Sequence, residues 1–286
     1  MPNIKSVVVV HAENKPRMPA YLAELRDWLS PLGWNACFVG AGAPDPEAVI
    51  GADLVLVMGG DGTFLTAARL ASGNPAGPIP LLGVDLGRLG FLSEVAFNEL
   101  PQALERFASG DFRLEDRAMM HAVAYRQGEI LGESYSLNDC VLSKGAFARL
   151  VELATYVDGV YVTTYDADGL VIATPTGSTA YALSAGGPLL TPDLPVFVLA
   201  PICPHSLSAR PIVLSDRVSV RVVIEGPANL DLLLSADGQP GLPVQMGDHV
   251  SFTRASRYAR LVKFDRIDFF ARLQSKLAWG PTRRPL

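Results

Sequence analysis

The stretch Asp53-Leu-Val-Leu-Val-Met-Gly-Gly-Asp-Gly-Thr-Phe-Leu-Thr-Ala-Ala-Arg-Leu-Ala71 carries the pattern on which the fold prediction rests. Residues 53–58 predict a buried strand, because the five residues after Asp53 are all apolar, and the spacing from Thr63 onward predicts a helix. The glycines at 59, 60 and 62 therefore lie in a strand-to-helix turn. Such a turn exposes backbone N–H groups at the positive end of a helix, and glycine lets a phosphate approach them closely.

Asp61 places a negative charge inside this turn, where it would repel a phosphate. A carboxylate fits there if a divalent cation offsets the repulsion, or if it takes a proton from an attacking hydroxyl. Both roles belong to phosphoryl transfer. The alternative is that the glycines only make a tight turn and Asp61 caps the following helix. Short glycine motifs also match by chance, so the rest of the chain has to decide.

The composition is that of an ordinary soluble globular protein of about two domains, with 286 residues, 49% of them hydrophobic and 19% charged. The net charge of −5 argues against a general nucleic-acid or anionic-membrane binder. The cysteines lack C-x-x-C pairing and the histidines lack metal-ligand spacing, which argues against a zinc site. No apolar run reaches the ~18 residues of a membrane span, and Val7–Val10 is too short for a signal-peptide core. We therefore expect a cytoplasmic protein.

The order of the expected elements indicates two domains. In the first third, strand and helix signals alternate, which is the βαβ pattern of a parallel sheet covered by helices. After about Arg117 the period changes to that of strands, and Asp158-Gly159 predicts a hairpin turn. The expected strands are 6–10, 35–39, 54–58, 79–84, 150–157, 160–165, 170–173, 217–224, 230–235, 249–254 and 259–264, and the expected helices are 21–32, 63–71, 100–108 and 267–277.

We thus expect an α/β domain of residues 1–117 with a Rossmann-like parallel sheet, completed by residues 265–286, and an antiparallel β-domain of residues 118–264. The C-terminal helix is expected to return to the first domain.

Four further segments carry candidate ligand-binding residues. Phe91 follows a glycine-rich run and would either stack on a base or plug the core. Asn138-Asp139 would bond a ribose or a base edge, or simply form a turn. Residues 168–188, DGLVIATPTGSTAYALSAGGP, combine a strand, a Pro/Gly turn and several hydroxyls that either bind a ligand or cap the chain. Asp237-Gly238-Gln239 has a hairpin turn as its default explanation.

Three well-known motifs of other enzyme classes are missing from the sequence. There is no Gly-x-x-x-x-Gly-Lys-Ser/Thr run, and Gly40-x-Gly42 lacks the third glycine of a dinucleotide fingerprint. The residues around Ser178 do not form the G-x-S-x-G elbow of a hydrolase. These gaps argue against Walker-type, Rossmann-dehydrogenase and α/β-hydrolase chemistry.

Taken together, GGDGTFL at 59–65, GRLGFL at 87–92, Asn138-Asp139, the 168–188 run and PHSLSARP at 204–211 resemble the bacterial NAD kinase family (ATP/polyphosphate NAD kinases). The motifs occur in the family's order and cover most of the chain. The resemblance implies a β-sandwich NAD-binding domain at 118–264 and a homodimer or homotetramer. It also implies transfer of a phosphoryl group from ATP to the 2′-hydroxyl of the adenosine ribose of NAD, which gives NADP.

The resemblance also implies roles for individual residues. Asp61 would be the general base. Mg²⁺ or another divalent cation would arrive bound to ATP, and the protein alone would not form a metal site. Gly62 would allow close approach of NAD, Phe91 would line the adenosine pocket, and Asp168 would bond the nicotinamide end. The remaining implied binding residues are Asn138, Asp139, Arg149, Asp166, Thr176, Thr179, Ala180, Tyr181, Ala182, Leu183, Ser184 and Gln239.

Two positions depart from the family pattern. Many relatives have Glu where this chain has Asp139, and some have Arg where it has Asp166. The reversed charge at Asp166 leaves the donor, ATP or inorganic polyphosphate, undecided, and Arg149 is a candidate for the missing positive charge or a solvated surface residue. The alternatives are a lipid or sugar kinase with the same GGDGT run, and a dinucleotide-binding regulatory protein without turnover.

Overall fold

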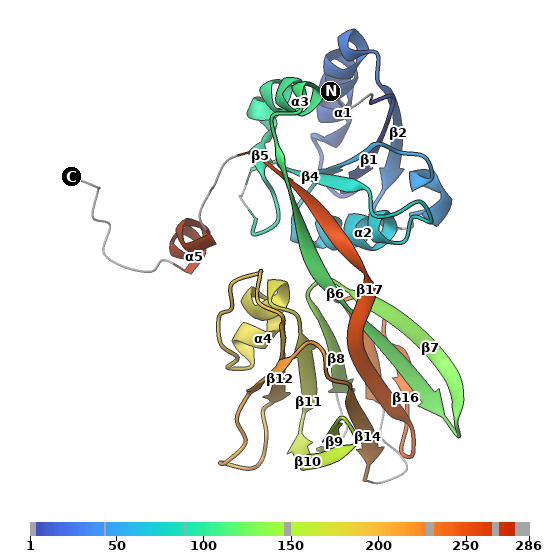
Figure 1. The fold of residues 1–286 in the computed structure, drawn as a ribbon, viewed down its shortest axis with the longest axis vertical. Helices are drawn as coiled ribbons and strands as arrows, with labels where there is room; N and C mark the ends of the chain where they lie inside the picture. The colour runs from blue at the N-terminus through green and yellow to red at the C-terminus, as the bar shows by residue number, and fades with distance from the viewer. Residues whose placement is uncertain are drawn as a thin grey trace, which may run out of the picture. The chain divides into compact units, whose positions relative to one another are not determined.

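A computed structural model describes residues 4–42, 44–87, 90–145, 150–226, 232–264 and 269–277 (Figure 1). The chain divides into two compact units. The first contains residues 1–115 and 260–286, and the second contains residues 116–259.

The first unit is a parallel sheet with helices on both faces, as the βαβ pattern predicts. The strands run in the order β2-β1-β3-β4, and every pair among them is parallel. Their bounds are β1 Ser6–His11, β2 Asn35–Gly40, β3 Leu54–Met58, β4 Pro80–Asp85 and, beside β4, the short β5 Val95–Ala96. The helices are α1 Met18–Leu29, η1 Ser30–Leu32, η2 Pro46–Val49, α2 Asp61–Ser72, η3 Phe97–Glu99, α3 Leu100–Ser109 and the C-terminal α5 Phe269–Leu277.

Burial explains why the central strands are continuous apolar runs. All five residues of β3 are buried, because helices cover both faces of a parallel sheet. Val7 and Val9 of β1 pack in a cluster with Leu25 of α1 and Phe107 of α3. The buried face of α2, which includes Phe64 and Leu65, covers the sheet beside β3 and β4. The turn between β3 and α2 is therefore held on a rigid support.

The second unit is a sandwich of two antiparallel sheets. One sheet has the order β13-β12-β11-β8-β15-β16, and the other contains β10, β9, β14 and β17 in sequence, with β6 and β7 beyond β17. The bounds are β6 Arg113–Arg126, β7 Glu129–Ser136, β8 Asp139–Lys144, β9 Val151–Val157, β10 Val160–Ala167, β11 Gly169–Ala173, β12 Val196–Ile202, β13 Ile212–Ser215, β14 Val220–Glu225, β15 Leu232–Ala236, β16 Leu242–Val244 and β17 His249–Lys263. The predicted β-sandwich is thus present.

Two apolar clusters stabilise this unit. The larger one joins inward-facing residues of both sheets, such as Leu142, Leu170, Val222 and Phe252. The smaller one lies on the other face of β8, β11 and β12, where Ala182 of the short helix α4 (Tyr181–Ser184) packs. The strand β11 is buried on both faces as a result, which explains its unbroken apolar sequence.

The hairpin predicted at Asp158-Gly159 joins β9 and β10, and both turn residues have positive φ, 47° and 80°. Such a turn matches the twist of antiparallel strands and favours Asp-Gly. The two strands predicted at 249–254 and 259–264 are wrong in one respect, because the structure has a single strand, β17, from His249 to Lys263. Buried Ala255 and Ala259 continue its alternation through the expected break.

The helix predicted from Thr63 begins two residues earlier, so Asp61 is its first residue and Gly60 its N-cap. Every helix in the described ranges is too short or too polar to cross a bilayer.

Candidate active site

Asp61 lies at the start of α2, at the carboxyl end of the buried strand β3. Its two carboxylate oxygens accept backbone N–H groups from the turn after β4. Phe91 N donates to Oδ2 and Leu92 N donates to Oδ1, each at 3.2 Å. The side chain is half-buried. Asp61 is therefore an oriented carboxylate, and its side chain does not cap its own helix.

Glycines bring this turn close to its neighbours. A Cβ on Gly90 would lie 2.2 Å from Asp61 Oδ1, and a Cβ on Gly83 of β4 would lie 2.8 Å from Ser93 Cα. Neither contact is possible for a larger residue without movement. Gly60 and Gly62 have open space where a Cβ would be, and both are exposed. The backbone on either side of Asp61 is therefore not covered by other side chains at these two positions.

Sequence reasoning missed a buried charged cluster behind the same turn. Glu94 accepts Lys263 Nζ at 2.7 Å and Arg272 Nη2 at 3.2 Å, and its other oxygen accepts Phe264 N at 3.0 Å. Arg272 Nη1 also donates to the carbonyl oxygens of Gly90 and Ser93. The residues come from three separate segments of the sequence, and no spacing pattern links them.

In the second unit, Asp237 organises the turn that carries Asn138 and Asp139. Its carboxylate accepts the backbone N–H groups of Leu137 at 3.0 Å, Asn138 at 2.8 Å and Asp139 at 3.3 Å. Asp237 and Gly238 have φ of 51° and 68°, so the default hairpin explanation is right for the backbone. The Asp237 side chain does more than form the turn, because it fixes the start of β8.

Asp139 is a buried carboxyl group, with 5% of the residue exposed. Its pKa is raised from 3.8 to about 7, chiefly by burial and also by the nearby Asp237 charge, while the backbone N–H of Tyr181 acts in the opposite direction. A perturbed carboxyl beside polar turn groups is typical of a functional site.

The run after β11 folds back on the Asn138 turn. Thr174 N donates to Asn138 O at 2.9 Å, and the Thr174 hydroxyl donates to Leu137 O. A Cβ on Gly177 would lie 2.1 Å from Asn138 O, so glycine is required at this approach. The segment forms a single 3₁₀ turn, η4 Thr176–Thr179, followed by the four-residue α4.

Several hydroxyls of this run already have partners within the protein. Ser178 Oγ donates to Leu190 O and accepts Leu190 N. Thr176 Oγ1 accepts Arg117 Nη1 at 3.3 Å. Ser178 therefore joins η4 to the chain around Leu190, and these bonds are not helix caps. Beyond these, Tyr181 and Ser184 are exposed, Thr179, Ala180 and Leu183 are half-buried, Ala182 is buried against the sheet, and Gln239 is exposed after the 237–238 turn.

Asp168 connects β10 and β11 and forms an ion pair that the sequence did not indicate. Lys144 Nζ lies 2.6 Å from its Oδ1, and both side chains are partly exposed. Asp168 N donates to Ile202 O at 2.9 Å, which fixes the backbone. The carboxylate of Asp168 is thus held by a cation of the same sheet.

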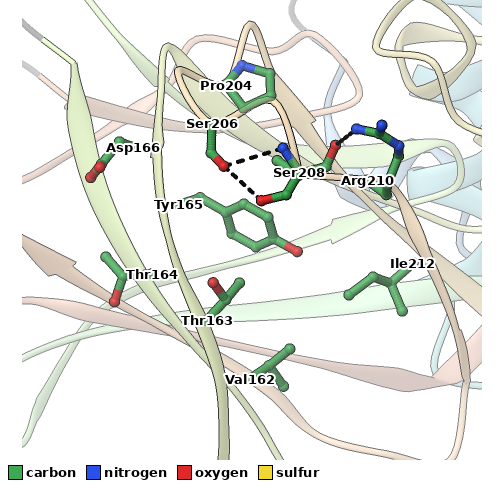
Figure 2. Close-up of a pocket in the computed structure, with 11 residues that line it drawn as sticks. Val162, Thr163, Thr164, Tyr165, Asp166, Pro204, Ser206, Ser208, Arg210 and Ile212 are labelled. Atoms are coloured by element: carbon green, nitrogen blue, oxygen red, sulfur yellow. Dashed lines mark hydrogen bonds between the residues drawn. The ribbon is translucent and has the colours of Figure 1, made fainter.

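Asp166 lies elsewhere, on the wall of a cavity of about 340 Å³ that β10 forms with the segment after β12. Figure 2 shows Asp166 and Arg210 on opposite sides of this cavity, with Ser206 and Ser208 between them. Arg210 Nη1 donates to Leu207 O and Ala209 O, each at 2.7 Å. A positive charge is therefore present across the cavity from Asp166. Arg149 lies outside the described residues.

The donor set at Asp61 is a single carboxylate whose oxygens each accept one N–H group. Mg²⁺ is normally bound in proteins by one or two carboxylates together with phosphate oxygens and water, so this set fits an ion that a nucleotide carries in. In the part of the chain that the structure describes, no three His, Cys, Asp or Glu side chains are grouped as a metal site.

Comparison with known proteins gives two family matches. The ATP-NAD kinase N-terminal domain matches residues 42–112, and the ATP-NAD kinase C-terminal domain matches residues 137–264. The NAD kinases of Geobacter metallireducens and Geotalea daltonii are 43% and 41% identical to this chain, each alignment covering 97% of this chain and 99% of the relative.

Solved structures agree with these matches. Yeast NADH kinase complexed with NADH has a TM-score of 0.89 at 25% identity, covering 99% of this chain and 90% of the yeast chain. An NAD kinase from Archaeoglobus fulgidus in complex with ATP has a TM-score of 0.75 at 24% identity, covering 96% of this chain and all of that chain, and supports the fold alone.

The α/β unit with its glycine-turn carboxylate, the β-sandwich and these matches define an enzyme class, the phosphotransferases that act on an alcohol group. Within that class the chain belongs to the ATP-dependent NAD kinase family.

Proposed function

We propose that this enzyme transfers the terminal phosphoryl group of ATP to the 2′-hydroxyl of the adenosine ribose of NAD, with Asp61 as the general base. The observation that supports this role is the orientation of the Asp61 carboxylate by Phe91 N and Leu92 N, each at 3.2 Å, at the end of an exposed glycine turn. The 2′-hydroxyl would give its proton to the Asp61 carboxylate as its oxygen bonds to the γ-phosphorus, while the bond from that phosphorus to the bridging oxygen breaks and ADP leaves.

Phosphoryl transfer has a loose transition state with charge on the peripheral oxygens, so catalysis is mainly positioning and charge stabilisation. A divalent cation bound to ATP would neutralise charge on the phosphates. Asp61 would orient the 2′-hydroxyl and accept its proton. Gly60 and Gly62, which leave open space where a Cβ would be, would let the substrates approach the backbone at the start of α2.

The β-domain, residues 118–264, would bind NAD. Asn138 and Asp139 would bond ribose or base, and their backbone is fixed by three N–H bonds to Asp237. Tyr181, exposed on α4, would provide an aromatic wall, and Asp168 would bond the nicotinamide end while Lys144 balances its charge. Phe91, Thr179, Ala180, Ser184 and Gln239 would complete the contacts.

For the phosphoryl donor we propose ATP, with polyphosphate as the substrate to compare. The carboxylate of Asp166 would repel an anion bound next to it, whereas the guanidinium of Arg210, across the same cavity, would attract one. Arg210→Met should therefore affect activity with polyphosphate more than activity with ATP if the cavity holds part of a long anionic donor. Equal loss with both donors would contradict that assignment.

The test of the function is NADP formation from NAD, ATP and Mg²⁺, read with an NADP-specific dehydrogenase, for the wild type, Asp61→Asn and a matched control. Asp61→Asn should lower kcat by roughly 10²- to 10⁴-fold, the usual contribution of a general base, and leave NAD binding measured by calorimetry nearly unchanged. The control is Asp45→Asn, because Asp45 also accepts a backbone N–H, from Glu47, at a helix start away from the glycine turn; its kcat should equal that of the wild type.

Near-normal turnover of Asp61→Asn would remove the base assignment. NAD binding without NADP formation by the wild type, with every donor, would instead make the protein a dinucleotide-binding regulator.

We also propose that the enzyme is a homodimer or homotetramer. The supporting observation is the sheet edge β10, where Val160, Tyr161 and Val162 are exposed in a row. An apolar edge strand is open to pairing with another copy. Light scattering should give an oligomeric mass that falls to that of the monomer in Tyr161→Glu; a monomeric wild type would contradict this proposal.

A further inference from the structure

Arg272 in the C-terminal helix α5 is a buried arginine, with 5% of the residue exposed. Its Nη1 donates to two carbonyl oxygens of one turn, Gly90 O at 3.2 Å and Ser93 O. Its Nη2 donates to Glu94 Oε2 at 3.2 Å. One guanidinium therefore bonds the first and the last residue of the turn formed by residues 90–93, and also the side chain of Glu94, the residue after it.

The two residues between those carbonyls, Phe91 and Leu92, are the ones that donate to the Asp61 carboxylate. The turn thus has Asp61 on one side and Arg272 on the other. Within the turn, Gly90 N donates to Ser93 Oγ at 3.0 Å, and Glu94 N donates to Gly83 O of β4 at 2.8 Å. Any shift of residues 90–93 would displace the N–H groups that orient Asp61.

Glu94 connects this arrangement to the end of β17. Its carboxylate accepts Lys263 Nζ at 2.7 Å and Phe264 N at 3.0 Å, and both charged side chains are buried. Glu94, Lys263 and Arg272 together carry one net positive charge close to the turn. A planar fork is needed to bond two carbonyls and a carboxylate simultaneously, and Arg has that geometry while Lys does not.

We propose that Arg272 is a positioning residue for the phosphoryl-transfer step. It fixes the 90–93 turn so that Phe91 N and Leu92 N hold the Asp61 carboxylate in its reactive orientation. This inference rests on the proposed role of Asp61. It assigns a function in the reaction to the C-terminal helix, which lies about 200 residues after Asp61 in the sequence.

The experiment compares Arg272→Met with Lys276→Met, a matched removal of charge from an exposed position of the same helix. For Arg272→Met, kcat should fall roughly 10- to 100-fold, the range expected for a small misplacement of a reacting group. The KM for NAD should stay within about twofold, because most of the proposed NAD contacts are in the other unit and only those of Gly62 and Phe91 are in this one. Guanidinium ion at millimolar concentration should restore part of the kcat. Lys276→Met should have the kcat and KM of the wild type.

Hydrogen exchange gives a readout that does not depend on activity. The amides of Phe91 and Leu92 should exchange faster in Arg272→Met than in the wild type, and amides of β1 should not change. A kcat within twofold of the wild type, or unchanged exchange at both amides, would overturn the proposal, as would an equal loss in Lys276→Met.

If Arg272→Met does not fold, Arg272→Lys decides, because it keeps a buried cation without the fork: a lowered kcat at constant KM supports the proposal and a normal kcat refutes it. If the wild type forms no NADP, the proposed function is refuted. The exchange data would still show whether Arg272 fixes the 90–93 turn, so the two failures can be told apart.

Discussion

Neutralising Asp139 should change how stability depends on pH. Burial and the Asp237 charge raise the pKa of Asp139 from 3.8 to about 7 in the folded protein. A raised pKa means that the folded state binds this proton more tightly than the unfolded state. The stabilisation from the bound proton is complete below about pH 4 and is lost as the pH rises toward 7. Asp139→Asn, which carries no charge at any of these values, should not lose it.

The size of the effect follows from the shift. A change from 3.8 to about 7 is roughly three pKa units, and each unit corresponds to about 1.4 kcal/mol, so the unfolding free energy of the wild type should fall by about 4 kcal/mol relative to Asp139→Asn between pH 4 and pH 8. Because only 5% of the residue is exposed, water does little to weaken this effect. Relaxation of the turn around Asn138 makes the figure an upper bound.

Urea unfolding of both proteins at half-unit pH steps and constant ionic strength measures this difference directly. Groups remote from Asp139 contribute equally to the wild type and the variant, so their contributions cancel in the difference. Asp166→Asn, which removes an exposed carboxylate from the same unit, is the control and should differ from the wild type by less than about 0.5 kcal/mol throughout. A difference between wild type and Asp139→Asn that stays constant from pH 4 to pH 8 would refute the argument from burial.

Two further substitutions test the geometry around the site. Gly90→Ala would place a Cβ 2.2 Å from Asp61 Oδ1. Because the carboxylate can rotate away, we expect a small loss of stability and at least about a tenfold loss of kcat in the NADP assay. A kcat equal to that of the wild type would contradict the orientation described for Asp61. Lys144→Met leaves the partly exposed Asp168 without its partner at 2.6 Å, so the free energy of unfolding should change by less than about 1 kcal/mol. The KM for NAD should rise while kcat stays constant. An unchanged KM would contradict a role of Asp168 in NAD binding.

The central turn could be predicted because its signals are local. The apolar run Leu54–Met58 is buried on both faces, and the glycines that follow give way to a helical spacing, so strand, turn and helix are each specified by adjacent residues. The same holds for Asp158-Gly159, where a two-residue turn requires positive φ at both positions. In these segments, periodicity and turn chemistry agree.

Contacts between distant segments could not be predicted in this way. Nothing near Glu94 in the sequence indicates Lys263 or Arg272, which lie 169 and 178 residues away. Asp237 reads locally as an ordinary hairpin residue, and its bonds to residues 137–139 appear only after β8 and β15 pair. The single strand β17 was missed for a different reason, since Ala255 is too small to contribute to a hydrophobic pattern although it is buried.

The composition of the cluster behind Asp61 is itself an argument for its role. Burying three charges is expensive, and well-packed apolar residues often give equal or greater stability at such positions. Leu or Met at position 272 would suffice to dock an amphipathic helix, as buried Leu273 on the same helix illustrates. Apolar side chains cannot hold two carbonyl oxygens and a carboxylate at fixed positions, whereas Arg272 does. A costly polar cluster is therefore best explained by what it orients, and here that is the turn whose N–H groups bond the proposed catalytic base.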